Sequence, residues 1–192
     1  MKLDKSGVSA VILAGGEGRR MGQRNKGLLP LQGRAMIQHV INRLRPQVSS
    51  ILISANQDLA DYRALGYEVL PDQLPGTHGP LSGIYSAMTV AKSEWLACVP
   101  CDMPQLPLDL VARLSEAEPA ILARVAHDGT RQQSVCCLLH VSLRDKLKSF
   151  LQGPHQAVYR FLAAQHALEV DFADQAGAFA NLNTPQELKG FA

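Results

Sequence analysis

The sequence predicts an α/β fold, a three-layer αβα arrangement around a mainly parallel, Rossmann-like sheet. Apolar runs typical of strands alternate along the chain with segments whose apolar residues recur at helical spacing. The first run, at residues 8–13 (VSAVIL), lacks polar alternation, which is typical of a strand buried on both faces. The 192 residues, of which 46% are apolar and 19% charged, fit one domain with a single core.

The elements follow from this rhythm in chain order. Pro46 ends the first helical pattern, Gly66 ends the second, and Pro80 lies near the start of the third. Asp128-Gly129 is a turn signal that predicts a hairpin between the fifth and sixth strands. We expect strands at 8–13, 50–54, 68–70, 95–99, 120–125 and 135–139, helices at 35–44, 59–65, 81–91, about 108–114, 142–151 and 157–164, and further apolar pieces at 168–172 and 178–182.

Composition excludes several classes of protein. A net charge of +2 gives no reason to expect nucleic acid or a membrane surface as partner. We find no apolar run of the ~18 residues that a membrane helix needs and no signal peptide. The spacing of the four cysteines is a poor disulfide framework, so we expect free thiols and a cytoplasmic protein.

One cysteine pair imitates a redox motif. Cys98-Val99-Pro100-Cys101 has the C-x-x-C spacing of thiol oxidoreductases. Reactive cysteines of that class lie at the start of a helix, whereas Cys98 falls inside a predicted strand. We therefore interpret it as a structural thiol.

The segment after the first strand is rich in glycine and arginine. Residues 13–26 begin with Leu13, Ala14, Gly15 and Gly16, and Arg19, Arg20, Arg24 and Lys26 follow. Glycines let backbone N–H groups approach phosphate oxygens, and the cations balance a triphosphate. The dinucleotide pattern fails at Met21, and the P-loop pattern fails because Gly27 follows Lys26. The alternative is a flexible, solvated basic loop.

Asp102 follows the fourth predicted strand, between Pro100 and Pro104. A rigidly held carboxylate suits Mg²⁺, which keeps several waters and is completed by substrate phosphates. The alternative is that Asp102 caps the next helix.

Two further segments follow the second and third predicted strands at the same sheet edge, where ligands of α/β proteins bind. Asp72 can accept hydrogen bonds from a guanine edge or a ribose hydroxyl. Gly83 lies in the first turn of a predicted helix whose N-terminus can meet a base or a phosphate. Ser54 and Asn56 are candidates for base or ribose contacts, and an ordinary turn is the alternative.

Near the C-terminal end, Asn181 and Asn183 share one face of an extended segment and are candidates for contacting phosphate or metal-bound water. The competing interpretation is that Asn183 or Thr184 caps a short helix. Arg131, just past the hairpin turn, is a candidate for binding a second anionic substrate.

These motifs together resemble a known family. The LAGG-x-x-x-RMG loop followed by Lys26 resembles the sugar-nucleotidyltransferase-like proteins. KGLL at 26–29, GPL at 79–81, PCDMP at 100–104 and NLNTP at 181–185, in that order, resemble the molybdenum cofactor guanylyltransferases along nearly the whole chain.

The resemblance implies a nucleotide-diphospho-sugar transferase type of fold and transfer of GMP from GTP to molybdenum-bound molybdopterin, with Mg²⁺ as cofactor. It implies one nucleotidyltransferase domain over 1–192, with a nucleotide-binding half at about 1–105 and a second-substrate half at about 106–192. Arg20 takes the place of the family's loop arginine, and we assign catalytic roles to Arg20, Lys26 and Asp102. The family's GTP contacts carry over to Leu13, Ala14, Gly15, Lys26, Asp72 and Asp102, the last of which also binds the metal.

This chain departs from the family in two places. Ser54 stands where some members carry asparagine, with Asn56 two residues on, and residues 131–134 (RQQS) differ from a proline-containing pattern. The resemblance also implies a monomer that transiently contacts molybdopterin-synthesis proteins and molybdoenzyme chaperones. A cytidylyltransferase for molybdopterin or for a small phosphorylated metabolite, and a non-catalytic GTP-binding module, are the alternatives that remain.

Overall fold

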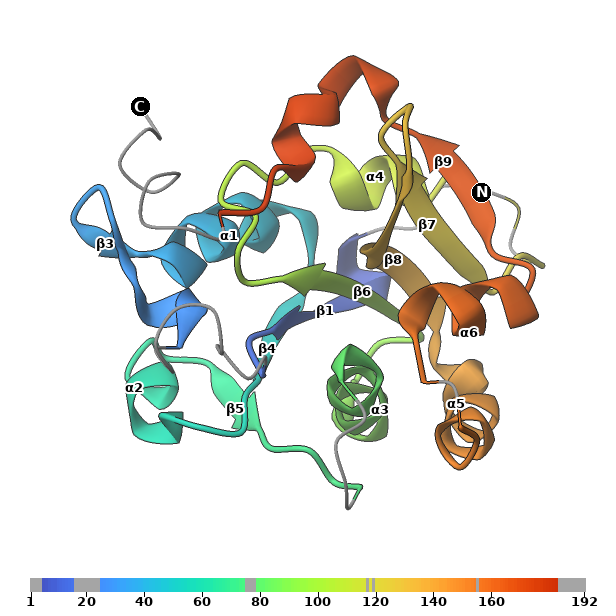
Figure 1. Cartoon of the computed structure of the whole chain (residues 1–192), viewed down its shortest axis with the longest axis horizontal. Helices are drawn as coiled ribbons and strands as arrows, with labels where there is room; N and C mark the ends of the chain where they lie inside the picture. Colours follow the sequence, from blue (N-terminus) through green and yellow to red (C-terminus); the bar gives the residue numbers. More distant parts are fainter. Residues whose placement is uncertain are drawn as a thin grey trace.

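The computed structural model describes residues 5–15, 25–74, 79–116, 118, 120–154 and 156–182. A seven-stranded sheet with strand order β5-β4-β1-β6-β8-β7-β9 crosses the molecule, with helices on both of its faces (Figure 1). The predicted three-layer α/β fold is confirmed. Strands from both predicted halves of the chain share this one sheet.

The sheet is parallel except around one strand. β8 runs antiparallel to both of its neighbours, β6 and β7, whereas the other four pairs of neighbouring strands are parallel. The strands are β1 (Val8–Leu13), β4 (Ser50–Ser54), β5 (Glu68–Leu70), β6 (Trp95–Pro100), β7 (Ala123–His127), β8 (Gln132–His140) and β9 (Leu168–Asp171).

The helices form two layers. One layer contributes α1, α2, α4 and the 3-10 helix η6 to one core cluster, and the other contributes α3, α5 and α6 to a second. The α-helices are α1 (Met36–Leu44), α2 (Leu59–Arg63), α3 (Pro80–Val90), α4 (Leu110–Leu114), α5 (Arg144–Leu151) and α6 (Val158–Ala164). The 3-10 helices used below are η3 (Lys26–Leu28) and η6 (Ala173–Phe179).

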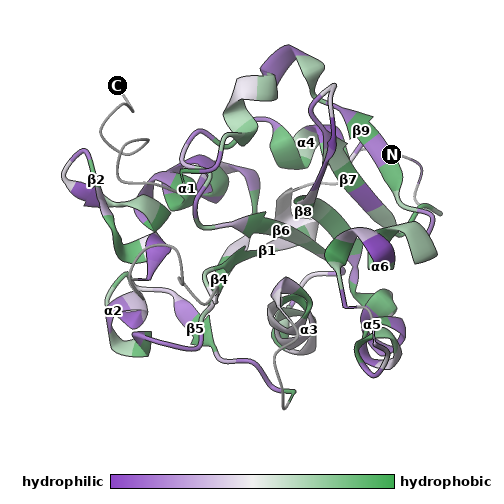
Figure 2. Ribbon diagram, in the orientation of Figure 1, coloured by the Kyte–Doolittle hydropathy of each residue, from purple (hydrophilic) through white to green (hydrophobic). Residues whose placement is uncertain are grey.

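Alternation along β1 explains why two cores form. Ala10 and Ile12 belong to the cluster under α1, whereas Val11 faces the cluster under α3. All three are fully buried. Figure 2 shows hydrophobic residues along the strands and hydrophilic ones on the outer helix faces and loops, so the uninterrupted apolar run reflects a strand covered on both sides.

The C-terminal part shows the main differences from the sequence prediction. The hairpin at Asp128-Gly129 is confirmed, but β7 begins at Ala123 rather than at residue 120, and a register shift interrupts its pairing after Val125. Residues 168–171 form an edge strand. The piece at 178–182 forms no strand, because η6 extends to Phe179, and Phe179 packs edge-on against Phe172 in the core.

The sequence analysis did not predict a small hairpin that the structure contains. Two-residue strands β2 (Pro30–Leu31) and β3 (Arg34–Ala35) form an antiparallel hairpin outside the main sheet. Gln32 and Gly33 at its turn both have positive φ, as a type I′ turn requires. Because the strands are so short, no periodic pattern marks them, and only the Gln-Gly pair is a signal.

A buried arginine holds the connection between α4 and β7. Arg124 is 1% exposed, and its guanidinium donates to the carbonyls of Leu114, Glu118 and Ile121 at 3.0–3.2 Å. The same group lies 4.3 Å from the ring centroid of Trp95. Carbonyl oxygens and an aromatic face thus replace water around this cation, and burial lowers the pKa of Arg124 from its usual value.

Within the described part of the chain, no helix is long and apolar enough to cross a membrane.

Candidate active site

Four parallel strands end at one level of the sheet. Leu13, the last residue of β1, pairs with Ser54 of β4 and with Pro100 of β6, and Ser54 in turn pairs with Leu70 of β5. The segments that follow these strands therefore meet at one edge, where ligands bind in open α/β sheets. Most of the site residues predicted within residues 1–105 come from these segments.

Backbone hydrogen bonds continue past the strand ends. The N–H of Ala14 donates to the Ser54 carbonyl at 2.8 Å, and the N–H of Cys101 donates to the Leu13 carbonyl at 3.1 Å. On the far side, the N–H of Ala55 donates to the Leu70 carbonyl at 3.0 Å. Leu13 and Ala14, two of the predicted GTP contacts, are therefore fixed from both sides.

Lys26 and Asp102 meet across this edge. The Lys26 Nζ lies 3.4 Å from the Asp102 Oδ2, although the two residues are 76 positions apart. Their side chains remain 27% and 13% exposed, so an anionic ligand can reach both. The alternative that Asp102 caps the next helix is wrong, because α4 begins only at Leu110.

Asn56 and Asp72 form a second pair. The Asn56 amide donates to the Asp72 Oδ2 at 2.9 Å, and the Asp72 N–H donates back to the Asn56 Oδ1 at 2.9 Å. A Cβ built on Gly15 would lie 3.4 Å from the Asn56 Nδ2, so the start of the glycine-rich segment passes beside this pair. The two residues proposed for base or ribose contacts thus act as one rigid unit.

Ser54 and Gly83 pack against each other beneath the edge. Ser54 is 3% exposed, and a Cβ on Gly83 would collide with the Ser54 Oγ. Glycine is needed there so that α3 can approach the sheet. We predicted nucleotide contacts for both residues, and both are buried beneath the end of β1. Their contacts with the nucleotide stay predictions.

Asn181 lies next to the aspartate. The N–H of Leu182 donates to the Asp102 carbonyl at 3.0 Å, which ties the C-terminal segment to the turn after β6. Among the described residues, the buried Asn181 Oδ1 has no hydrogen-bond partner. An unpartnered buried oxygen costs free energy unless a ligand or water satisfies it, which makes this position consistent with the predicted phosphate or metal-water contact.

Arg131 lies at the tip of the β7–β8 hairpin. Because β8 runs antiparallel to β6, the start of β8 lies on the side of the sheet where β6 ends. The Arg131 side chain is 69% exposed, and its Nε lies 4.0 Å from the Asp128 Oδ2. Its exposed guanidinium is available to a second, anionic substrate.

Several predicted site residues lie outside the described residues. They are Gly16, Arg19, Arg20, Arg24, Asn183 and Thr184. Their predicted roles stay predictions.

The structure adds a group that sequence patterns did not reveal. Asn25 donates to the Gln57 carbonyl at 3.4 Å and to the Asp58 Oδ2 at 3.0 Å, and it accepts from the Tyr62 hydroxyl at 3.2 Å. These residues come from the connection after β4 and from α2. No local motif marks them, because their relation to Lys26 exists only in three dimensions.

The donor set at Asp102 fits Mg²⁺. Among the described residues there is no group of three or more His, Cys, Asp or Glu side chains that could hold a metal ion by itself. Mg²⁺ is commonly held by one or two carboxylates together with waters and substrate phosphates. A single, partly exposed carboxylate beside a lysine therefore suits an ion that arrives with a nucleotide.

The cysteines lie in the core, as the sequence interpretation expected. All four are buried free thiols, and Cys98 of β6 lies opposite Cys137 of β8 in the strand register. Burial raises the pKa of the Cys98 and Cys136 thiols well above the usual value, and it raises the pKa of Cys101 to about 12. Such thiols are poor nucleophiles at neutral pH, so a thiol oxidoreductase is not supported.

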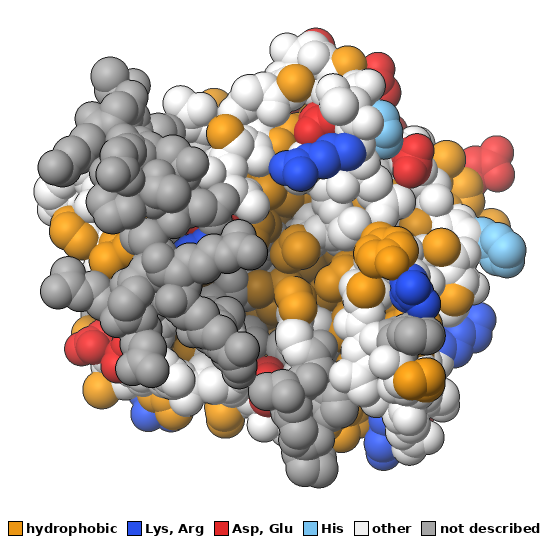
Figure 3. Space-filling model, in the orientation of Figure 1, with side chains coloured by type: hydrophobic (Ala, Val, Ile, Leu, Met, Phe, Trp, Pro, Cys, Tyr) orange, Lys and Arg blue, Asp and Glu red, His pale blue; other side chains and the backbone are white. Residues whose placement is uncertain are grey.

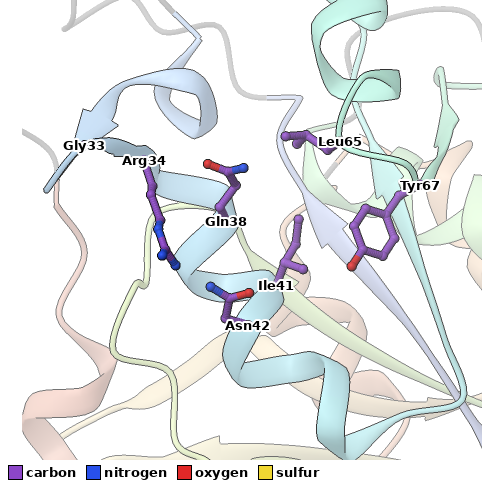
Figure 4. Close-up of a pocket in the computed structure, with 7 residues that line it drawn as sticks. All are labelled: Gly33, Arg34, Gln38, Ile41, Asn42, Leu65 and Tyr67. Atoms are coloured by element: carbon purple, nitrogen blue, oxygen red, sulfur yellow. The ribbon is translucent and has the colours of Figure 1, made fainter.

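A surface pocket of about 410 Å³ lies elsewhere, between α1 and the connection from α2 to β5. Figure 4 shows Arg34, Gln38 and Asn42 facing Leu65 and Tyr67 across it. None of its lining residues was predicted for the site, and the Gln38 Oε1 is used to accept the Ala35 N–H at the start of α1. We assign this pocket no role in the reaction.

The surface seen in Figure 3 separates apolar from charged side chains. Hydrophobic side chains gather at the centre of this face, and lysine, arginine, aspartate and glutamate lie mainly around it.

Comparisons with known proteins agree with this geometry. Residues 10–170 match the family described as the MobA-like NTP transferase domain. The chain is 46% identical over 188 residues to the molybdenum cofactor guanylyltransferase of Shewanella woodyi, which covers 96% of this chain and 95% of that protein.

Two solved structures share the fold at low identity. Molybdopterin-guanine dinucleotide biosynthesis protein A from Archaeoglobus fulgidus has a TM-score of 0.77 at 20% identity, covering 95% of both chains. The 4-diphosphocytidyl-2C-methyl-D-erythritol synthase of Anaerococcus prevotii has a TM-score of 0.71 at 12% identity, covering 97% of both chains. The fold alone therefore does not select the base, and the full-length sequence relationship does the classifying. The chain belongs to the MobA-like NTP transferases, and among them to the molybdenum cofactor guanylyltransferase family.

Proposed function

We infer that this chain transfers GMP from GTP to molybdenum-bound molybdopterin, giving the molybdopterin guanine dinucleotide cofactor and pyrophosphate. The observation that carries the inference is the meeting of Lys26 and Asp102, 3.4 Å apart, at the edge where four parallel strands end. The membership in the guanylyltransferase family supports GTP and molybdopterin as the substrates.

The reaction needs alignment more than proton transfer. An oxygen of the terminal phosphate of molybdopterin attacks the α-phosphorus of GTP and forms a new P–O bond. The bond between the α-phosphorus and the oxygen that bridges it to the β-phosphorus breaks, and this oxygen leaves with the pyrophosphate. A phosphate monoester is already anionic, so no general base is required. Residues that hold both substrates in line and neutralise the triphosphate supply the catalysis.

Lys26 supplies a positive charge beside the phosphates, and we propose that N–H groups of the glycine-rich segment donate to the same phosphate oxygens. Asp102 is the residue that would hold Mg²⁺, and Asn181 would bind a phosphate or a metal-bound water. When bound, the ion neutralises charge on the triphosphate and on the departing pyrophosphate. Arg20, in the same loop, is proposed to share the pyrophosphate with Lys26.

Base recognition is proposed for the Asn56–Asp72 pair. Guanine presents N–H donors that a carboxylate accepts. Asn56 already holds one Asp72 oxygen, which fixes the direction in which the carboxylate presents its remaining lone pairs. We propose that Asp72 reads the guanine edge and that Asn56 contacts the ribose or the base.

We propose the cytoplasm as the site of action, because four free buried cysteines are typical of a reducing compartment. Protein partners follow from the same proposal. A molybdopterin donor and a chaperone of a molybdoenzyme are the classes that would supply the substrate and take the product.

A nucleotide competition assay tests the function. Pyrophosphate release is measured with molybdopterin, Mg²⁺ and equal concentrations of GTP, CTP or ATP. We expect GTP to be preferred at least about tenfold, a difference of one well-formed hydrogen-bonded contact. Equal or better use of CTP would indicate a cytidylyltransferase, and GTP binding without pyrophosphate release would indicate a binding module.

A further inference from the structure

The segment that carries Lys26 is fastened to the connection between β4 and α2. Asn25, the residue before Lys26, uses both ends of its side-chain amide. Its nitrogen donates to the Gln57 carbonyl at 3.4 Å and to the Asp58 Oδ2 at 3.0 Å. Its oxygen accepts from the Tyr62 hydroxyl at 3.2 Å. The side chain is therefore fixed in rotation as well as in position.

Tyr62 is the buried end of this arrangement. Its residue is 0% exposed and belongs to the core cluster under α1 and α2. Burial raises the pKa of the Tyr62 phenol above its usual value, so the hydroxyl stays protonated and remains a donor. A Cβ on Gly27 would lie 2.7 Å from the Tyr62 hydroxyl oxygen, which shows how closely the backbone after Lys26 passes over it.

The connection after β4 also reaches the proposed base site. Asn56 exchanges two hydrogen bonds with Asp72, and the next two residues, Gln57 and Asp58, hold Asn25. Three consecutive residues thus contact the base-side carboxylate on one side and the segment that carries Lys26 on the other. Tyr62, which lies in the core cluster beneath α2, joins the segment that carries Lys26 to the core through its hydrogen bond to Asn25.

We propose that Tyr62 is a positioning residue for the nucleotide: through Asn25 its hydroxyl fixes Lys26 beside Asp102. The proposal rests on the proposed function in taking a nucleoside triphosphate as the ligand at Lys26. It assigns Tyr62 no contact with the substrate. The consequence is that the Tyr62 hydroxyl contributes to triphosphate affinity only while Lys26 is present.

A double-mutant cycle on binding isolates this effect. The affinity for Mg·GTP is measured by isothermal titration calorimetry for the wild type, Tyr62→Phe, Lys26→Ala and the double variant. We expect Tyr62→Phe to weaken binding about five- to tenfold, the size of one net hydrogen bond. In the Lys26→Ala background the same change is expected to have no further effect, because the group it positions is gone.

Tyr67→Phe is the matched control. Tyr67 is a nearby tyrosine that lines the surface pocket together with Arg34 and Asn42. We expect Tyr67→Phe, which also removes one hydroxyl, to leave the Mg·GTP affinity within about twofold of the wild-type value. The proposal is overturned if Tyr62→Phe leaves affinity unchanged, or if it weakens binding by the same factor with and without Lys26.

Two further measures keep the outcome decisive. If Tyr62→Phe does not fold, judged by near-ultraviolet circular dichroism, Asn25→Ala at a partly exposed position runs the same cycle with the same expectation. If the competition assay selects CTP, Mg·CTP replaces Mg·GTP. A different base preference, or binding without turnover, then overturns the proposed function and leaves this test of Tyr62 intact.

Discussion

Two cations show how differently the two parts of the molecule use charge. Lys26, in the N-terminal part of the chain, lies at the sheet edge with its ammonium 3.4 Å from Asp102 and 27% of its side chain exposed. Arg124, in the C-terminal part, is 1% exposed and donates to three backbone carbonyls. Lys26 faces a carboxylate that a ligand can reach, whereas Arg124 is enclosed by its own chain.

The difference in exposure and in hydrogen-bond partners separates a residue available to a ligand from a residue that stabilises the fold. A guanidinium has five N–H donors, and Arg124 directs three of them at backbone carbonyls between the end of α4 and the start of β7. Helix ends leave such carbonyls without partners inside the helix. The type of side chain does not distinguish a phosphate ligand from a structural tie, but its exposure and its partners do.

Replacing Asp102 with Ala should have the largest effect on turnover. Removing the carboxylate takes away the proposed metal ligand and the ion pair between Asp102 and Lys26, so the rate of pyrophosphate release should fall about 10²- to 10³-fold. Asp145→Ala, at a side chain 85% exposed on α5, is the control. Near-normal turnover of Asp102→Ala at saturating Mg²⁺ would contradict the metal assignment.

Replacing Arg124 with Met tests the structural side of the comparison. The three carbonyls would lose their donor while a side chain of similar length stays, so the free energy of unfolding should fall by about 2–4 kcal/mol. Urea unfolding followed by the fluorescence of Trp95, the single tryptophan, measures this. Turnover per folded molecule should stay near normal, and Arg144→Met serves as an exposed control. A large loss of turnover without loss of stability would show that Arg124 serves the reaction.

Replacing Arg131 with Ala should have the smallest effect of the three. Because this side chain is exposed and only loosely paired, its loss should raise the KM for molybdopterin about three- to tenfold and leave the KM for GTP unchanged. Steady-state kinetics with each substrate varied in turn measures both constants. Arg160→Ala on α6 is the control, and an equal rise for both substrates would place Arg131 with GTP instead.

The sequence predicted most of the sheet correctly because its strands are locally distinct. Residues 8–13, 50–54 and 68–70 form strands with the predicted bounds, since uninterrupted apolar runs between glycine, proline and helical patterns leave few alternatives. The bounds of β7 were less accurate. Arg124 is a charged residue inside the strand, and its burial depends on partners that no local pattern reveals.

The sequence by itself determined the fold class and the family, and it predicted the kind of site. A glycine-rich cationic loop after a buried strand and an aspartate between two prolines indicated a triphosphate and a metal, and the order of the motifs indicated the family. Only the tertiary structure decided which side chains meet. Lys26 reaches Asp102 across 76 residues, Asn56 pairs with Asp72, and Tyr62 holds Asn25. Local spacing fixes strands and turns, but contacts between distant segments depend on strand order and register, which the whole folded sheet sets.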